Sequence, residues 1–260
     1  MSVQSHIHYK FPAQFSIRHV AFMRPFSWLF RGWSDLISHP RASLAHGLIV
    51  TGLFMVTLML TSSHVYVLAA VISGFMLIGP IMAAGLCELS RRREKGEPLS
   101  FDDSLSGLSR NQTSLVRFAG MLLGVSVLWF VISGLVLKVT VGDVAPAFDQ
   151  SLWGGFLSIV TPMQILLYLV VGGLLAGIVF VLSVVSVPAI IDSSIKALDA
   201  VFISIKVVLN NIPTMLVWAA LLVLMTGIGL ASFLLAMVVI YPLLGHATWH
   251  AYRDLVQNEG

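Results

Sequence analysis

Long apolar runs separated by short polar segments dominate this chain. Two of the runs, Leu44–Glu88 and Pro213–His250, are about twice the length of a membrane span, which needs about 20 residues. The polar stretch Thr61–His64 divides the first run, and Thr226–Gly229, with its two glycines, divides the second. Two runs of single length lie between them: Phe118–Leu137 and Gln164–Ile191. The pattern predicts an all-α polytopic membrane protein with six transmembrane helices arranged as three hairpins.

Three segments with apolar residues at helical spacing precede the predicted hairpins. They are Pro25–Ser38, Phe101–Leu108 and Ser193–Leu209. Each one reaches a polar stop before the next apolar run: His39-Pro40, Asn111-Gln112 or Asn211-Ile212-Pro213. Such amphipathic segments are typical of helices that lie in the membrane interface with their apolar faces toward the acyl chains.

The second helix of each predicted hairpin carries a proline inside its apolar run, at Pro80, Pro188 and Pro242. An amphipathic segment, a polar stop and a hairpin with a proline in its second helix thus recur in the same order. This favours three related units starting near residues 25, 98 and 193. We expect a single membrane domain over residues 25–254, preceded by a cytoplasmic segment (1–24) and followed by a short tail (255–260). The alternative is that prolines and interfacial helices recur here only because both are common in membrane proteins.

Composition and charge agree with a membrane location. Hydrophobic residues make up 57% of the chain and charged residues 10%, with a mean hydropathy of +0.92. Soluble domains average about 25% charged residues. All Lys and Arg residues except Lys138 fall on one side of the predicted spans, which places both termini in the cytoplasm. The basic run in Arg91–Pro98 is interpreted as a solvated segment that fixes topology, so nucleic acid is not an expected partner.

Counting from each proline places four polar residues on one helical face. Asp192 and His246 are fourth after their prolines, and Glu88 and His250 are eighth. If the units pack symmetrically, these side chains converge at the cytoplasmic mouth. Three further residues are expected nearby, one of them early in the first span: Cys87, Lys196 and His46.

His246 and His250 stand four residues apart, so both imidazoles could bind one metal ion. Imidazole and carboxylate ligands suit Zn²⁺ or Cu²⁺, and Glu88, Asp192, Cys87 and His46 are the possible neighbours. The glutamate that makes such a histidine pair catalytic in zinc proteases is missing, because Ala247-Thr248-Trp249 separates the two residues. The alternative is that these polar residues only anchor helix ends beside an aromatic belt.

The remaining motifs narrow the function without fixing it. Gly120 with Gly124, and Gly173 with Gly177, form GxxxG pairs that we interpret as packing sites. No acidic or basic residue lies near the middle of a predicted span, and no phosphate loop, GxSxG elbow or CxxC motif is present. We therefore expect a non-enzymatic accessory, scaffold or assembly component of a membrane complex, with other membrane subunits as partners and no required cofactor. One alternative is a small-solute or metal-ion permease that uses the His and carboxylate residues at the cytoplasmic mouth. Another is an enzyme that acts on lipids.

Several stretches resemble a bacterial family known only as predicted integral membrane proteins with a domain of unknown function. The matching pieces are Gly32–Leu36 with His39-Pro40, Gly79-Pro80 leading to Glu88–Arg92, Ser183–Pro188 and Pro242–Arg253. The resemblance implies a bacterial inner-membrane location and a six-helix fold. It implies no activity, substrate or cofactor.

Overall fold

The computed structural model describes residues 15–61, 79–141 and 161–258, and these are almost entirely helical. The first predicted unit contains helices α1 (Arg24–Ser38), α2 (Pro40–Thr61) and α4 (Ala84–Lys95). The second contains α5 (Phe101–Arg110), α6 (Gln112–Val141), α8 (Pro162–Ser183) and α9 (Ser186–Ser193). The third contains α10 (Ala197–Asn210), α11 (Ile212–Ala231) and α12 (Met237–Leu255). Short strands β1 (Phe15–Ile17) and β2 (Val256–Asn258) pair antiparallel, so the first and last described residues meet.

Four described helical stretches are long and apolar enough to cross a membrane: Pro40–Leu60, Gln112–Ile132, Leu169–Ser193 and Ile212–Ala231. The predicted count of six is not confirmed. Most of the second predicted span lies outside the described residues. The sixth, α12, is a helix but is not among the four stretches, and α1, α2, α4 and α11 pack around it. The structure thus supports an all-α membrane protein with several apolar helices.

The turn between α11 and α12 lies later in the chain than the sequence suggested. The predicted break at Thr226–Gly229 is wrong, because α11 continues through both glycines to Ala231. The chain turns at Ser232–Ala236, where Phe233 and Leu234 adopt positive φ angles of 53° and 70°. The Ser232 hydroxyl accepts a hydrogen bond from the Ala236 amide at 2.9 Å and so stabilises the turn.

The amphipathic helices α1, α5 and α10 are each followed by a residue with nearly the same backbone conformation. The φ and ψ angles are −137° and 62° at His39, −141° and 56° at Asn111, and −133° and 38° at Asn211. Pro40 disfavours helical geometry at His39, and asparagine side chains compete with the helix for backbone hydrogen bonds. A long apolar helix begins directly after each of these hinge residues. This geometry is consistent with the three-unit repeat, which stays a prediction.

The long helices that follow the hinges also bury the same register. The third, fourth and seventh residues after each hinge are all less than 9% exposed. They are Ala42, Ser43 and His46 in α2, Ser114, Leu115 and Phe118 in α6, and Thr214, Met215 and Trp218 in α11. Spacings of three, four and seven residues mark one face of a helix, so the same face of each helix points into the protein.

The short amphipathic helices turn their apolar stripes outward. The exposed large apolar side chains of α1 are Phe26, Phe30, Trp33 and Ile37. Its buried face carries Trp28, Gly32 and Asp35 instead. In α5, Ser104 and Gly107 are buried while Leu105 and Leu108 are exposed. Outward apolar stripes are what helices at a lipid interface require.

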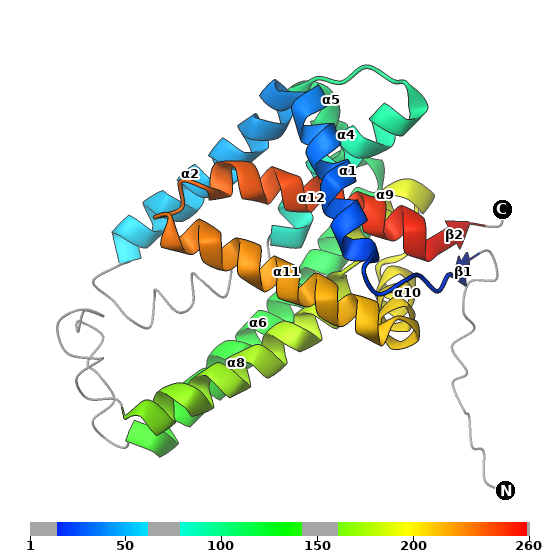
Figure 1. Cartoon of the computed structure of the whole chain (residues 1–260). Coiled ribbons are helices and arrows are strands. Elements are labelled where there is room, and N and C mark those ends of the chain that lie inside the picture. Colours follow the sequence, from blue (N-terminus) through cyan, green and yellow to red (C-terminus); the bar gives the residue numbers. More distant parts are fainter. Residues whose placement is uncertain (1–14, 62–78, 142–160, 259–260) are drawn as a thin grey trace, which may run out of the picture.

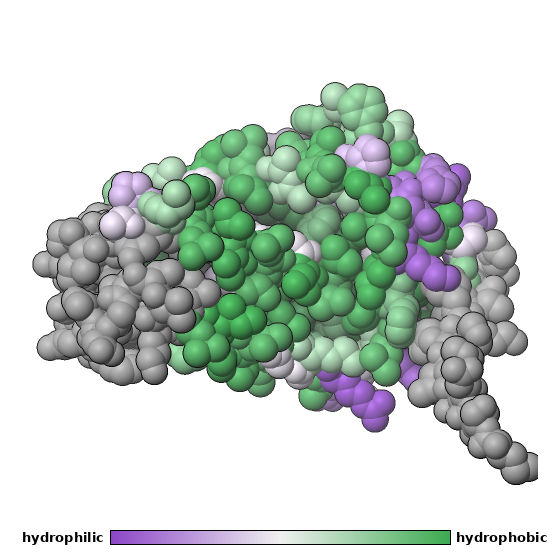
Figure 2. All heavy atoms as spheres, turned by 90° about the horizontal axis from the view of Figure 1, so that it is seen from below, coloured by the Kyte–Doolittle hydropathy of each residue, from purple (hydrophilic) through white to green (hydrophobic). Residues whose placement is uncertain are grey.

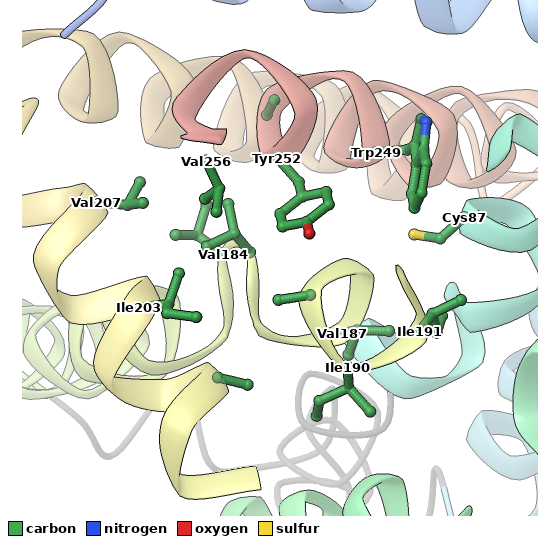
Figure 3. Packing of buried hydrophobic residues seen from close by; sticks show 14 of the residues in the cluster. Cys87, Val184, Val187, Ile190, Ile191, Ile203, Val207, Trp249, Tyr252 and Val256 are labelled. Carbon is green, nitrogen blue, oxygen red and sulfur yellow. The ribbon is translucent and has the colours of Figure 1, made fainter. Parts of the chain in front are cut away.

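Helix α12 lies at the centre of the packing. In Figure 1 it runs between α1, α2 and α11, and Figure 3 shows Trp249 and Tyr252 pointing from it toward α9 and Cys87 of α4. An acidic residue fixes its C-terminal end to α1. Both Arg24 and Arg31, and also the Trp28 indole, donate to Oδ2 of Asp254 at 2.6–2.8 Å. Burial alone would raise the pKa of Asp254, but these hydrogen bonds lower it.

Close backbone approach fixes α2 against α12. Pro242 has no amide hydrogen, so the carbonyl of Val238, one turn earlier, loses its helical partner. Gly47 of α2 lies against this carbonyl, and a Cβ at Gly47 would stand 2.0 Å from its oxygen. Only glycine permits this contact without a backbone shift.

We predict that Gly47→Leu destabilises the protein by about 1–3 kcal/mol, because the new side chain must push α2 away from Val238. Thermal unfolding of the purified protein in detergent measures the effect. Gly52→Leu is the matched control, since Gly52 is also in α2 but its Cβ direction is open. Equal unfolding temperatures for the two variants would contradict the close contact.

Candidate functional site

A buried cluster of polar side chains connects α12 to three neighbouring helices. His250 of α12 donates from Nε2 to Oδ2 of Asp35 in α1, at 2.9 Å. Ser90 of α4 donates to the same carboxylate oxygen at 2.5 Å and also lies 2.8 Å from Nδ1 of His246. Ser43 of α2 lies 2.9 Å from Nε2 of His246. All five side chains are buried, and we refer to them as the Asp35 cluster.

The contacts determine which nitrogen of His246 carries the proton. Ser90 has one hydroxyl hydrogen and gives it to Asp35, whose ionised carboxylate can only accept. Ser90 must therefore accept a hydrogen bond from Nδ1–H of His246. In the neutral imidazole Nε2 is then an acceptor, and the Ser43 hydroxyl donates to it. A directed chain of hydrogen bonds runs from Ser43 through His246 and Ser90 to Asp35.

An arginine of α4 compensates the negative charge of Asp35. Arg93 of α4 pairs with Oδ1 of the carboxylate and also donates to Ser34 at 3.3 Å. Burial alone would raise the pKa of Asp35, but hydrogen bonds from His250 and Ser90 lower it to about 2. Asp35 is therefore ionised across the physiological range, and the cluster binds α1, α4 and α12 to one another.

The Asp35 cluster is closed rather than arranged around a bound ligand. Both ring nitrogens of His246 are hydrogen-bonded within the protein, and so is Nε2 of His250. Nδ1 of His250 is the one buried side-chain atom of the cluster that lacks a partner. The arrangement holds a neutral histidine and a carboxylate in fixed positions, which suits structural locking of the helices.

The predicted convergence of Glu88, Asp192, His246 and His250 at one cytoplasmic mouth is wrong. The two histidines meet at Asp35, but Glu88 is fully buried among three arginines instead. Arg91 binds its carboxylate through two hydrogen bonds of 2.8 Å, and Arg110 of α5 binds it at 3.0 and 3.1 Å. This ion cluster joins α4 to α5.

The other predicted neighbours also have separate surroundings. Asp192 accepts a hydrogen bond from the Tyr252 hydroxyl at 3.0 Å, and Lys196 is exposed. Cys87 is buried, with its sulfur 3.8 Å from the carbonyl of Gly245. His46 lies in the buried face of α2 and is hydrogen-bonded to Ser104 of α5 at 2.7 Å.

The prolines have three different local settings. Pro188 is the third residue of α9, where its missing amide hydrogen costs nothing because the helix has just restarted. Pro80 lies among the described helical residues 79–82, which a turn at Ala83 separates from α4. Pro242 stands inside the continuous helix α12. Their common position in the predicted repeat therefore does not give a common structure.

The predicted Zn²⁺ or Cu²⁺ site lacks a ligand set in the described part of the chain. No group of three or more His, Cys, Asp or Glu side chains there is arranged to hold a metal ion. His246 and His250 do lie on one face, as predicted, but their neighbours are the hydroxyls of Ser43 and Ser90 and the carboxylate of Asp35.

Four residues of the site were not anticipated from the sequence: Asp35, Ser43, Ser90 and Arg93. A clue to Ser43 exists in the repeat. At the fourth and seventh positions after the hinge, α6 has Leu115 and Phe118, and α11 has Met215 and Trp218. The first unit has Ser43 and His46 at these positions. Alignment of the units on their hinges would have marked both as polar exceptions on a buried face.

Comparison with known proteins agrees with this membrane architecture. Residues 67–192 match a family described as predicted integral membrane protein (DUF2189). The chain resembles this membrane family. The resemblance expected from the sequence is thereby confirmed, as are the membrane location and the apolar helices. No curated protein and no solved structure matches the chain.

We predict that Asp35→Asn destabilises the protein by about 2–3 kcal/mol, because buried His250 and half-buried Arg93 lose their charged hydrogen-bond partner. Denaturation in detergent, followed by circular dichroism, measures the loss. Asp102→Asn removes an exposed carboxylate from α5 and should have little effect. An Asp35 variant as stable as this control would contradict a locking role.

The pKa of Asp35 also predicts a pH dependence. The folded pKa of about 2 lies below the usual value near 3.9, so the unfolded chain binds the proton more tightly. The contribution of Asp35 to stability, about 2–3 kcal/mol, is present above about pH 4 and is lost as the pH falls toward 2. Unfolding free energies measured between pH 5 and pH 2 should fall more steeply for the wild type than for Asp35→Asn, and parallel curves would contradict this.

Proposed function

We propose that the chain is a non-enzymatic integral membrane component that acts through helix contacts with other membrane proteins. One observation carries the proposal: two glycine pairs lie on the outer surface of its long helices. Gly120 and Gly124 are exposed on α6, and Gly173 and Gly177 are exposed on α8. A Cβ at any of the four would meet no atom within 4 Å.

Internal packing does not account for these glycines. Where glycines do serve internal contacts, the approach is close. A Cβ at Gly32 would stand 2.8 Å from the backbone of Ala247, and one at Gly245 would stand 2.6 Å from Leu86. Helices in lipid associate where small residues let two backbones come close, and GxxxG is the best-known such motif. Open GxxxG pairs on two helices therefore support contact with helices of another chain.

The surface supports the same membrane setting. Figure 2 shows a broad apolar face over the long helices, with hydrophilic residues gathered mainly toward one end. In Figure 1, β1, β2 and α10 lie toward that end, whereas the α11–α12 turn and the far ends of α6 and α8 lie toward the other. The excess of Lys and Arg on one side of the predicted spans favours cytoplasmic termini by the positive-inside rule. The resemblance to the bacterial membrane family supports an inner-membrane location.

We predict that the double substitution Gly120→Leu and Gly124→Leu removes a partner without unfolding the protein. Two leucines would hold a second helix away from α6, while the Cβ of each would meet no atom of its own chain within 4 Å. The measurement is native mass spectrometry of the tagged protein after mild extraction from its own membrane. We expect the wild type in a stoichiometric complex and the variant alone.

Gly52→Leu on α2 is the control, because Gly52 is equally open but has no glycine four residues away. This variant should retain the complex. Recovery of the wild type as a lone monomer, or an intact complex in the double variant, would overturn helix contact through α6. The same pair of substitutions at Gly173 and Gly177 tests α8.

A further inference from the structure

Helix α1 has three distinct sides. Its outward side carries four large apolar residues, each 45–75% exposed, at spacings of four, three and four residues: Phe26, Phe30, Trp33 and Ile37. The positions one residue further on, about 100° around the helix, hold only polar side chains: Ser27, Arg31, Ser34 and Ser38. The side with Trp28, Gly32 and Asp35 is buried against α12. An apolar face flanked by a polar strip is thus open on the surface.

Helix α2 sets the depth of α1 in the membrane. The apolar stretch Pro40–Leu60 has 21 residues. At 1.5 Å per residue its length is about 31 Å, which matches a hydrocarbon core of about 30 Å and places Pro40 at the boundary of the core. His39 alone separates Pro40 from the end of α1. In Figure 1, α1 runs across α12 instead of continuing the direction of α2. Helix α1 therefore lies at the membrane boundary.

The charges of α1 are engaged within the protein. Its two basic residues, Arg24 and Arg31, donate to the carboxylate of Asp254 at 2.7 and 2.6 Å. Its acidic residue, Asp35, pairs with Arg93 of α4. Each basic side chain of α1 thus has a carboxylate partner already, and the attraction of this helix to lipid rests on its apolar face.

We propose that the apolar face of α1 binds exposed acyl chains of the leaflet next to the termini, so that the protein prefers membranes in which this leaflet is loosely packed. Large apolar side chains enter a leaflet where gaps between headgroups expose the acyl chains, and such insertion depends on curvature and lipid composition. A helix with free basic residues would follow anionic lipid instead. The proposal is independent of the helix contacts through α6.

The fixed position of α1 makes this a preference of the whole protein. Asp254 of α12 holds the first half of α1 through Arg24, Trp28 and Arg31. His250 of α12 holds the second half through Asp35. Because α1 is held in both halves, it does not insert separately from the other helices. The energy of its contact with lipid is therefore expressed in how the full-length protein distributes between membranes.

The test uses the full-length Lys95→Cys variant, reconstituted from detergent into a mixture of small and large phosphatidylcholine vesicles that carry different lipid dyes. A membrane-impermeant fluorescent maleimide then labels the copies with α1 outside. Lys95 is exposed and lies two residues after Arg93, which pairs with α1, whereas Cys87 is fully buried. The outer leaflet of small vesicles is the loosely packed one. We expect about twofold more label per lipid on the small vesicles.

Phe30→Ser and Ile37→Ser, made separately in this background, should each bring the ratio of small to large vesicles close to one. Both side chains are exposed, at 75% and 55%, so neither substitution removes a buried contact. Phe233→Ser is the matched control, because Phe233 is 84% exposed but lies in the turn at the far end of α11, and it should keep the ratio.

Anionic lipid separates packing from charge. Phosphatidylglycerol added equally to both vesicle sizes should leave the ratio unchanged. An equal distribution of the Lys95→Cys protein, a ratio that both α1 variants retain, or a ratio set by the phosphatidylglycerol content would overturn the proposal. Gly120→Leu with Gly124→Leu should keep the ratio, so loss of the protein complex and loss of the lipid preference can be told apart.

Discussion

The arrangement of the helices depends on the burial of one carboxylate, that of Asp35. A charge held out of water must be paired, and Asp35 receives hydrogen bonds from Ser90 and Arg93 of α4 and from His250 of α12. These contacts cannot form unless α1, α4 and α12 meet. Helix α12 is thereby drawn among the other helices, which explains why its later turns are buried by protein although its sequence resembles the end of a membrane span. His246 then reaches Ser43, and the lock extends to α2.

Local rules made much of the fold predictable. The hinges at His39, Asn111 and Asn211 were visible because a proline or an asparagine interrupts helical periodicity, an effect that needs no tertiary contact. The lengths of the apolar runs also identified α6 and α11 correctly as long helices. The turn before α12 was misplaced, because glycine pairs are tolerated inside membrane helices, and the actual turn depends on the Ser232 side chain.

The site was harder to predict because its partners are distant in sequence. Counting eight residues from Pro80 to Glu88 assumed an unbroken helix, but the chain is interrupted between them at Ala83. Glu88 therefore does not share the surroundings of His246. The arginine run was interpreted as solvated, yet Arg91 is only 2% exposed because Glu88 pairs with it. Nothing local distinguishes such an arginine from its neighbours, and Arg110, which completes the cluster, comes from another helix.

Polar side chains of this protein mostly face inward, whereas small and apolar residues are open on its surface, and this contrast indicates how the protein acts. The described ionic and histidine groups near α12 are mostly occupied by partners within the chain, so their chemistry serves to hold helices together. Small residues are divided in the same way, since Gly47 meets α12 whereas Gly120 faces open space. Among the described residues, the membrane-facing surface is where the protein leaves small and apolar groups open, at two glycine pairs and at an apolar groove between α8, α10 and α11. A protein with its polar groups enclosed and its small and apolar surfaces open interacts most readily with other helices in the bilayer.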